Sequence, residues 1–357
     1  MRDLVHFVAL LMLLLVAAPG CGGRAESGTP AVQHKDRLTI AQWNVENLFD
    51  PVDDPTNPGD DEFTPGTWRQ WTPERYHRKV ANLADILARV DADVVCLEEV
   101  ENRRVLDDLN LALIEQHHAS YPYIVHRDGP DHRGIDVALM SRYRPVEAHW
   151  LTPLPDQREV IVADLAPEGQ RLVVMVNHWK SRLEGEAETA PLRTQIATVV
   201  RAELDRLLAA ASNTAIVVAG DFNDNFDCSS IHETLLSVGD RDAVASDPAG
   251  RLLYSLHAGL APDARGTIYY RKNKVWDSFD SMSVSRSLLS GAGGWQVAPG
   301  TYAVFSIPAM RESDGTPKSF RRIYDAETGH RPYQEGYSDH FPVRVELQRV
   351  AAAPGRN

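Results

Sequence analysis

The sequence predicts a layered α/β fold in which β-sheets are covered by helices. Short apolar runs with the composition of β-strands recur along the chain, at residues 38–43, 93–97, 135–140, 172–176, 215–219 and 341–347. Several of these runs are apolar on successive residues rather than on alternate ones, as expected for strands that are covered on both faces. Residues 73–90 and 191–211 instead repeat apolar side chains at helical spacing. Strands and helices of these kinds indicate a sandwich of packed layers.

The length and composition of the chain allow a large core, and its net charge limits what the surface can bind without specificity. The chain has 357 residues, 43% of them hydrophobic, and no internal repeat or interior linker divides it. We therefore expect a single domain over residues 37–349 and a disordered tail over 350–357. The formal net charge of −13 argues against a surface built mainly for nonspecific binding of nucleic acid, although it leaves room for local basic patches.

The N-terminus is typical of a targeting segment. Arg2 precedes an apolar run at 5–17, which is too short to span a bilayer comfortably, and small residues then lead to Cys21. This arrangement is similar to a bacterial lipoprotein signal, in which Cys21 would be the acylated first residue of the mature protein. Pro19 fits that pattern imperfectly, and the alternatives are an ordinary secretory signal cleaved nearby or an uncleaved anchor. We expect an export signal over 1–21 and a flexible tether over 22–36, in a protein that is lipid-anchored to a bacterial membrane, periplasmic or secreted.

Two stretches are too irregular for a helix or strand. Residues 50–66 combine six carboxylates with prolines, and we weigh a Ca²⁺-binding loop against a solvated loop that covers one edge of a sheet. The absence of any regular spacing of ligands, such as that of an EF-hand, favours the solvated loop. Residues 291–336 are expected to form a long excursion that shapes access to substrate.

The predicted helices are supported by the spacing of their apolar residues. The first carries Val80, Leu83, Ala84, Leu87 and Ala88, and the second carries Leu192, Ile196, Val199, Val200, Leu204, Leu207 and Leu208. Between them, Cys96 lies in the apolar run 93–97, where it is expected to pack as a small hydrophobic residue. A disulfide with Cys228 is the alternative if the compartment is oxidising.

Polar clusters follow four of the predicted strands, where layered sheets present functional groups. They are Asn44-Val45-Glu46-Asn47, Glu98-Glu99-Val100-Glu101, Asn177-His178-Trp179-Lys180 and Gly220-Asp221-Phe222-Asn223-Asp224, and Asp339-His340 precedes the final strand. Carboxylate and amide oxygens without a cluster of Cys or His favour a hard ion, Mg²⁺ or else Mn²⁺ or Ca²⁺, over zinc. Such an ion suits the hydrolysis of phosphate esters, which needs charge on the phosphoryl oxygens to be neutralised.

Seven ordered motifs, which span almost the whole mature chain, resemble the endonuclease/exonuclease/phosphatase family. They lie at residues 42–49, 97–102, 133–139, 177–181, 220–224, 276–285 and 338–340. The resemblance implies a four-layered α/β/β/α sandwich, with two packed mixed β-sheets flanked by helices. It also implies that Asn44 and Glu99 hold the metal with Asp339 nearby. Asp221 and Asn223 would then orient the attacking water and the phosphate oxygens.

The resemblance assigns further residues to catalysis. His340 would be the imidazole at the phosphate, and its partner on a late strand would be Asp280, with Asp277 as the competing choice. His178 matches a second active-site histidine of some branches, and Asp136 is a candidate partner for it.

The remaining assignments concern charge around the site. Arg133 and Lys180 are expected to contact phosphate, and Arg182 is either a third such cation or a solvated one. The family usually has Gln at the position of Glu98, and this departure is expected to add negative charge near the metal. Strand alternation predicts that Glu98 points away from the cleft that Glu99 faces.

The sequence therefore predicts an exported, divalent-metal-dependent phosphoesterase that cleaves P–O bonds by in-line attack of water. A nuclease-like phosphodiesterase is favoured, and the alternatives are a sphingomyelinase-like enzyme acting on phospholipid, a phosphatase of small molecules and a catalytically silent binding domain. The expected partners are the phosphate ester and, through Cys21, a membrane. No protein partner is expected, and the chain is predicted to be a monomer.

Overall fold

The computed structural model describes residues 35–322 and 333–350. The predicted export signal with Cys21, nearly all of the tether and the tail after residue 350 lie outside the described residues. Within the described ranges, no helix combines the length and the apolarity needed to cross a membrane.

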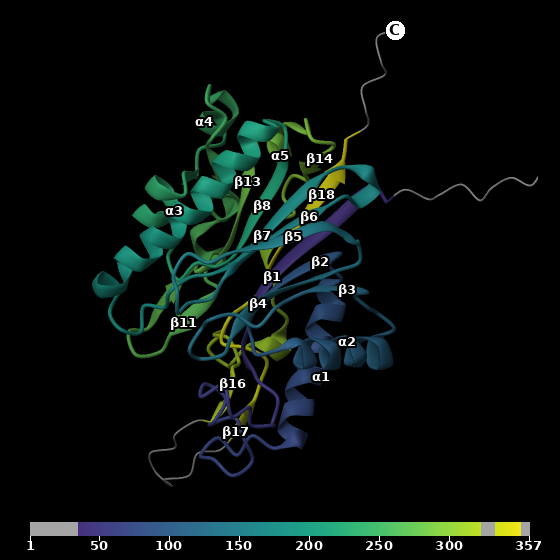
Figure 1. The fold of residues 1–357 in the computed structure, drawn as a ribbon, viewed down its shortest axis with the longest axis vertical. Helices are drawn as coiled ribbons and strands as arrows, with labels where there is room; N and C mark the ends of the chain where they lie inside the picture. Colours follow the sequence, from purple (N-terminus) through teal and green to yellow (C-terminus); the bar gives the residue numbers. More distant parts are fainter. Residues whose placement is uncertain (1–34, 323–332, 351–357) are drawn as a thin grey trace, which may run out of the picture. The chain divides into compact units, whose positions relative to one another are not determined.

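Two mixed β-sheets form the centre of the fold (Figure 1). The first has the strand order β14-β18-β1-β2-β4-β3, and β15 also pairs with β18. Its strands are β1 (Arg37–Leu48), β2 (Val94–Val100), β3 (Tyr123–Val125), β4 (Asp136–Ser141), β14 (Trp295–Val297), β15 (Ala303–Val304) and β18 (Val343–Arg349). The second has the order β5-β6-β7-β8-β13-β10-β9, and its strands are β5 (Pro145–Leu151), β6 (Val160–Leu165), β7 (Leu172–His178), β8 (Ala215–Asp221), β9 (Ser237–Val238), β10 (Leu253–Ser255) and β13 (Asp280–Ser285). Two hairpins stand apart from these sheets, β11 (Ile268–Tyr270) with β12 (Val275–Asp277), and β16 (Phe320–Arg322) with β17 (Tyr333–Glu335).

Helices cover the outer face of each sheet. Helices α1 (Pro73–Val90) and α2 (Arg103–His117) pack on the first sheet, and α3 (Glu186–Ala210) packs on the second. The shorter helices are α4 (Arg241–Ser246) and α5 (Arg286–Ser290), and single turns occupy Pro167–Gly169, Ser230–Thr234, Leu256–Gly259, Pro262–Ala264 and Pro308–Met310. One apolar core lies between the two sheets, and a separate core lies between each sheet and its helices. The predicted four-layered α/β/β/α sandwich is confirmed.

Local sequence signals account for the two predicted helices to different degrees. Helix α1 has the predicted bounds, because the Thr72 side chain caps its N-terminus, Pro73 occupies the first turn and Asp91 ends it in the left-handed conformation. Helix α3 begins at Glu186, five residues before the predicted start at Pro191. Proline is more common at the start of a helix than inside it, so Pro191 predicted the wrong N-terminal boundary for α3.

The predicted excursion at 291–336 is more regular than expected in its described part. Strands β14 and β15 lie in it, and both pair with β18 at the edge of the first sheet. The two cysteines of the domain are free, with Cys96 buried in the core between the sheets, so the alternative of a disulfide with Cys228 is wrong in this structure.

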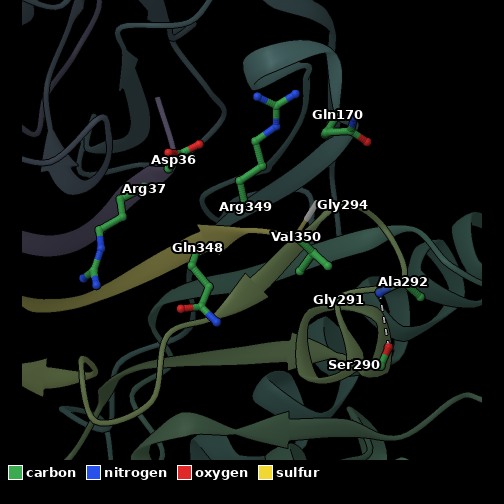
Figure 2. Close-up of a pocket in the computed structure, with 10 residues that line it drawn as sticks. All are labelled: Asp36, Arg37, Gln170, Ser290, Gly291, Ala292, Gly294, Gln348, Arg349 and Val350. Carbon is green, nitrogen blue, oxygen red and sulfur yellow. Dashed lines mark hydrogen bonds between the residues drawn. The ribbon is translucent and has the colours of Figure 1, made fainter. Parts of the chain in front are cut away.

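A hollow of about 1140 Å³ lies where β1 begins and β18 ends (Figure 2). Asp36, Arg37 and Arg349 line it together with backbone around Gly291 and Gly294. It borders the ends of the described chain, and its described lining residues include neither an acid paired with a base nor a group of metal ligands.

Candidate active site

At the C-terminal end of strand β1, away from the hollow at its start, polar residues replace the apolar residues of the core between the two sheets. On β8, Ala215, Val217 and Ala219 face the first sheet, so Asp221, two residues further along, faces the same way. The same alternation carries the inward-facing apolar rows of the neighbouring strands into Gln42 and Asn44 on β1, Glu98 on β2, His178 on β7 and Asp280 on β13. The apolar core therefore ends in a row of acids, amides and an imidazole.

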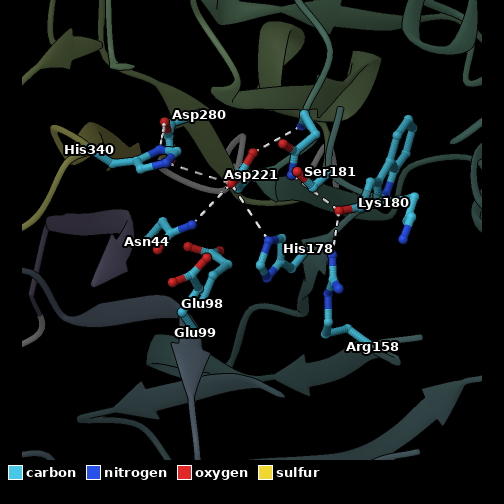
Figure 3. Close-up of polar contacts among 12 residues, drawn as sticks. Asn44, Glu98, Glu99, Arg158, His178, Lys180, Ser181, Asp221, Asp280 and His340 are labelled. Carbon is cyan, nitrogen blue, oxygen red and sulfur yellow. Dashed lines mark hydrogen bonds and ion pairs between the residues drawn. The ribbon is translucent and has the colours of Figure 1, made fainter. Parts of the chain in front are cut away.

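Strand register aligns three of these residues within the second sheet. His178 on β7 is opposite Asp221 on β8, and Asp221 is opposite Asp280 on β13. In the first sheet, Asn44 on β1 is opposite Glu98 on β2. Figure 3 shows the two sets of side chains facing each other across the gap between the sheets.

His340 and Asp280 form a buried acid–imidazole pair. The Nδ1 of His340 lies 2.6 Å from the Oδ2 of Asp280, and Gln42 Nε2 donates to the other carboxylate oxygen at 2.9 Å. Burial alone would lower the pKa of His340, but the charges of Asp280, Asp221 and Asp339 outweigh burial and raise its pKa well above the usual value. His340 is therefore an imidazolium near neutral pH, with Nδ1 held by Asp280 and Nε2 left for substrate. The competing Asp277 instead accepts a hydrogen bond from Asn225.

Asp221 lies at the centre of the site. Its Oδ2 accepts a hydrogen bond from Asn44 Nδ2 at 3.0 Å and lies 3.7 Å from His178 Nε2 and 4.0 Å from His340 Nε2. Its Oδ1 accepts from the backbone N–H of Asn223 at 2.9 Å. Burial raises the pKa of Asp221 to about 6, so the carboxylate can both ionise and accept a proton near neutral pH.

His178 is the neutral member of the pair of histidines. Burial, together with the nearby charges of Arg158, Arg133 and His340, holds the pKa of His178 well below its usual value. The site thus contains one charged and one neutral imidazole. The charged His340 can offer a substrate both positive charge and a hydrogen bond, whereas the neutral His178 can offer only a hydrogen bond.

Glu99 reaches the cavity because the backbone departs from regular strand geometry. Its φ is 63°, and the pairing of β2 shifts register between Glu98 and Val100. Glu46, Asn47 and Asn223 also have positive φ. Non-glycine residues in this region cost roughly 1–3 kcal/mol each, so the fold stores backbone strain at this site.

The structure places the Glu98 side chain differently from the direction that strand alternation predicts. Glu98, not Glu99, continues the inward-facing row that contains Asn44, and it lies fully buried with Gln42 Nε2 at 2.9 Å. Burial raises the pKa of Glu98 well above its usual value, and the charge of Asp280 adds to this effect. Burial therefore disfavours the charged form of Glu98, which opposes the predicted addition of negative charge near the metal.

The donors on the Glu99 side of the cavity suit a hard divalent cation. Glu99 accepts a hydrogen bond from the Asn47 N–H at 2.8 Å, and Asp339 is 39% exposed on the cavity. The side-chain Oδ1 of Asn44 accepts a hydrogen bond from the Glu46 N–H at 3.0 Å. Two carboxylates and an amide oxygen are the ligand types that Mg²⁺ and similar ions prefer. These residues fit a divalent metal.

Two buried charges support this edge. Glu46 accepts hydrogen bonds from Ser319 Oγ at 2.6 Å and from the Phe320 N–H at 2.7 Å. Lys79 is fully buried, and its Nζ has no hydrogen-bond partner in the described part of the chain. Burial lowers its pKa, while the carboxylates of Glu46, Asp339 and Glu99 oppose that shift. The sequence signal for Lys79 was a lysine among the apolar positions of helix α1, and sequence reasoning missed it.

The site opens into a cavity of about 420 Å³. Among the predicted residues, its lining includes Glu99, Arg133, His178, Asp221, Asn223, Asp339 and His340, whereas Asn44 and Asp280 lie behind it, bonded to Asp221 and His340. The rim adds Tyr269, Tyr270, Arg271 and Lys272 from the β11–β12 hairpin, and Arg321 from β16. These rim residues were not predicted, and the only sequence signal for them is the basic stretch at 271–274.

Two predicted site residues lie away from this cavity. Lys180 Nζ donates to Glu184 Oε1 at 2.8 Å, four residues along the chain, and is not among the lining residues. Asp136 opens β4 in the first sheet and accepts from the Gly129 N–H at 3.0 Å, whereas His178 ends β7 in the second sheet. The structure therefore does not pair Asp136 with His178, whose Nδ1 has no hydrogen-bond partner among the described residues.

The comparisons with known proteins agree with this geometry. The model of the endonuclease/exonuclease/phosphatase family matches residues 39–349. A comparison with curated proteins found no match.

Several solved structures share the fold at low sequence identity. A humanised D. rerio TDP2 superposes with a TM-score of 0.54 at 17% identity, covering 88% of this chain and 100% of that one. D. rerio TDP2 in complex with a single-strand DNA product gives 0.52 at 18% identity, with 88% and 100% covered. The mannosyl-6-phosphatase Bt3783 of Bacteroides thetaiotaomicron gives 0.51 at 18% identity, with 87% and 99% covered. The chain belongs to the endonuclease/exonuclease/phosphatase family, whose members are metal-dependent hydrolases of phosphate esters.

Proposed function

We propose that this chain is a nuclease-like phosphodiesterase that uses Mg²⁺, or else Mn²⁺ or Ca²⁺, and cleaves P–O bonds by in-line attack of water. The observation that carries this proposal is the single cavity shared by an imidazolium held by a carboxylate, a second carboxylate that can accept a proton, and hard metal ligands. A catalytically silent binding domain has no need for a charged pair held at 2.6 Å beneath its cavity.

The residues divide the reaction between them. Asp221 accepts the proton of the attacking water, and the backbone N–H of Asn223 keeps its carboxylate oriented. The imidazolium of His340 and the neutral imidazole of His178 donate hydrogen bonds to phosphoryl oxygens as negative charge builds up on them. The water oxygen bonds to phosphorus as the ester P–O bond on the opposite side breaks. A divalent cation bound by Glu99, Asp339 and Asn44 would neutralise charge on the phosphoryl and leaving oxygens.

The rim of the cavity supports a nucleic-acid substrate over a small phosphate. Arg133 and Lys272 line it, and neither forms an ion pair with a described carboxylate. Tyr269 and Tyr270 lie beside them. Cations that follow a phosphate backbone and aromatic rings that stack on bases are the usual means of binding single-stranded nucleic acid. This local basic rim occurs on a chain whose formal net charge is −13, so it is a feature of the site rather than of the whole surface.

The substrate can be assigned by comparing four classes side by side. Single-stranded DNA, plasmid DNA, sphingomyelin and a sugar phosphate monoester would be offered to the same preparation with Mg²⁺. We expect the two DNA substrates to be cleaved with the largest kcat/KM. Preference for sphingomyelin or for the monoester would instead assign a phospholipase-like enzyme or a small-molecule phosphatase.

We also propose that the protein is exported, anchored through a lipid on Cys21, and monomeric. The observation that supports export and anchoring is the apolar run at 5–17 followed by small residues and Cys21. Metabolic labelling with a radioactive fatty acid should label the wild-type protein in a bacterial host and fail to label Cys21→Ser. Light scattering of the domain would give the mass of one chain.

A further inference from the structure

The segment that connects β3 to β4 brings a histidine together with two aspartates outside the catalytic cavity. One ring nitrogen of His126 and one carboxylate oxygen from each of Asp128 and Asp136 all lie within 4.8 Å of one another. None of the three residues lines the catalytic cavity. Asp136 was predicted to pair with His178, but it lies in the first sheet and belongs to this group instead.

His126 is a buried imidazole without a hydrogen bond. Its side chain is 1% exposed, and its Nε2 has no hydrogen-bond partner among the described residues. Its Nδ1 lies 4.0 Å from Asp128 Oδ1, which is too far for a hydrogen bond. Burial lowers the pKa of His126 to about 4, so the ring is neutral near pH 7 and can offer a lone pair to a metal. A polar ring buried in this way costs free energy unless a further group binds it.

Asp136 adds a buried carboxylate that no side-chain cation balances. It is 4% exposed, and its Oδ2 accepts a hydrogen bond from the Gly129 N–H at 3.0 Å. Among the described residues, no Lys or Arg forms an ion pair with it, and the guanidinium of Arg127 is held by Glu159 through two hydrogen bonds of 2.6 Å. Burial raises the pKa of Asp136 to about 7. A cation bound beside it would favour the ionised form.

An ion and its water can reach this group from solvent. Asp128 and Asp136 line a cavity of about 410 Å³, and the Asp128 side chain is 80% exposed. Tetrahedral Zn²⁺ holds nitrogen and oxygen ligands at about 2.0–2.2 Å, so its ligand atoms are roughly 3.4 Å apart. The exposed Asp128 is free to close the small difference. Gly129 lets the backbone approach the site, because an added Cβ would lie 2.5 Å from Asp136 Oδ1.

We propose that His126, Asp128 and Asp136 bind a Zn²⁺ ion, with water as the fourth ligand. An imidazole nitrogen beside two carboxylates favours Zn²⁺ over Ca²⁺ and Mg²⁺, which prefer oxygen ligands alone. The competing explanation is a neutral His126 beside a protonated Asp136, which would satisfy burial without any ion.

The ion would join the two ends of the segment that carries Arg133. His126 and Asp128 precede Arg133 in the chain, and Asp136 follows it. Arg133 lines the catalytic cavity and donates to Asn47 Oδ1 at 2.7 Å. A bound ion would therefore restrain one wall of the cavity, although it would touch no substrate.

The test measures bound Zn²⁺ rather than activity, so it does not depend on the proposed function. The full chain, first stripped of metal, would be dialysed against micromolar free Zn²⁺ and its zinc content measured by atomic emission. We expect His126→Gln to bind one ion per chain fewer than the wild type. His77→Gln, which removes an exposed histidine of helix α1, should bind as much as the wild type. Zn²⁺ bound at the catalytic edge is common to all three proteins and cancels in the comparison.

Equal zinc contents of folded His126→Gln and the wild type would overturn the inference and leave the protonated Asp136 as the explanation. An equal loss in His77→Gln would overturn it as well. If His126→Gln does not fold by circular dichroism, the exposed Asp128 decides the question. Asp128→Asn should weaken the apparent Zn²⁺ affinity by roughly tenfold or more, and the matched Asp156→Asn should not. Unchanged affinity in Asp128→Asn would contradict the proposed site.

Discussion

The Nδ1 of His340 lies 2.6 Å from the Oδ2 of Asp280, and both side chains are buried at the end of the core between the sheets. Asp280 is the first residue of β13, and its carboxylate is also fixed by Gln42. The pair therefore joins the two sheets. Asp280 acts on the reaction through His340, whose orientation and charge it sets.

Asp280→Asn should lower kcat by roughly 10²-fold while leaving the concentration of metal needed for half-maximal activity near that of the wild type. The amide can still bond to the imidazole but no longer stabilises its positive charge, so the pKa of His340 should fall. The pH dependence of kcat for bis(p-nitrophenyl) phosphate would report both effects.

Asp277→Asn is the matched control for this change. Asp277 lies on β12 and bonds to Asn225 rather than to a histidine, so the variant should keep near-normal kcat. A fully active Asp280→Asn beside an inactive Asp277→Asn would show that the wrong carboxylate has been assigned to His340.

Glu99→Gln and Glu98→Gln should differ sharply although the residues are neighbours. Glu99→Gln removes a charged ligand and should raise the half-saturating Mg²⁺ concentration by roughly tenfold or more, with partial recovery of activity at high Mg²⁺. Glu98 is fully buried, and burial raises its pKa well above the usual value, so the nearly isosteric Gln should leave the metal dependence unchanged. Equal metal requirements in the two variants would refute the assignment of Glu99 as a ligand.

The basic turn of the β11–β12 hairpin should matter for nucleic acid and not for small diesters. Lys272→Ala with Lys274→Ala should weaken binding of single-stranded DNA and lower the slope of log affinity against log salt by about 1.5. Hydrolysis of bis(p-nitrophenyl) phosphate should be unchanged, because in the described part of the chain neither lysine forms a hydrogen bond or an ion pair with a catalytic residue. Arg144→Ala with Arg241→Ala, which changes cations outside the cavity lining, should leave the salt dependence as in the wild type.

Stability should fall in mild acid because of buried histidines. His257 is fully buried, and burial lowers its pKa to about 4 from an ordinary 6.5. The unfolded chain therefore binds a proton before the folded protein does, so the stability from this group is complete above pH 6.5 and is lost as the pH falls toward 4. A shift of this size corresponds to a loss on the order of 3 kcal/mol. Urea unfolding at several pH values should show a shallower decline between pH 6.5 and 4 for His257→Gln than for the wild type.

The sequence was a good guide where local pattern and position along a strand decide structure. Helix α1 follows from its cap and first turn, and the polar rows follow from strands that end at one edge of the sandwich. The resemblance to the family led to Asp280 as the partner of His340, and in the structure β13 pairs in regular register with β8 from Asp280 onward.

The parts that could not be predicted depend on local competition and on three-dimensional contact. Alternation alone would send Glu99 away from Asn44, and only the positive φ of the bulge returns it to the cavity. Lys180 was expected to contact the phosphate, whereas in the structure it pairs with Glu184, four residues along the chain. Lys272, on the β11–β12 hairpin, lines the site, and the buried Lys79 of helix α1 lies near its carboxylates. Both are brought there by the packing of segments that are distant in sequence, so no sequence motif predicts them.

The central claim is most directly tested by metal-dependent hydrolysis of bis(p-nitrophenyl) phosphate by the wild type and by His340→Ala. We predict measurable hydrolysis by the wild type with Mg²⁺ or Mn²⁺, abolition by EDTA, and a loss of at least about 10²-fold in kcat for His340→Ala at unchanged fold. Equal rates for the two folded proteins would contradict the account.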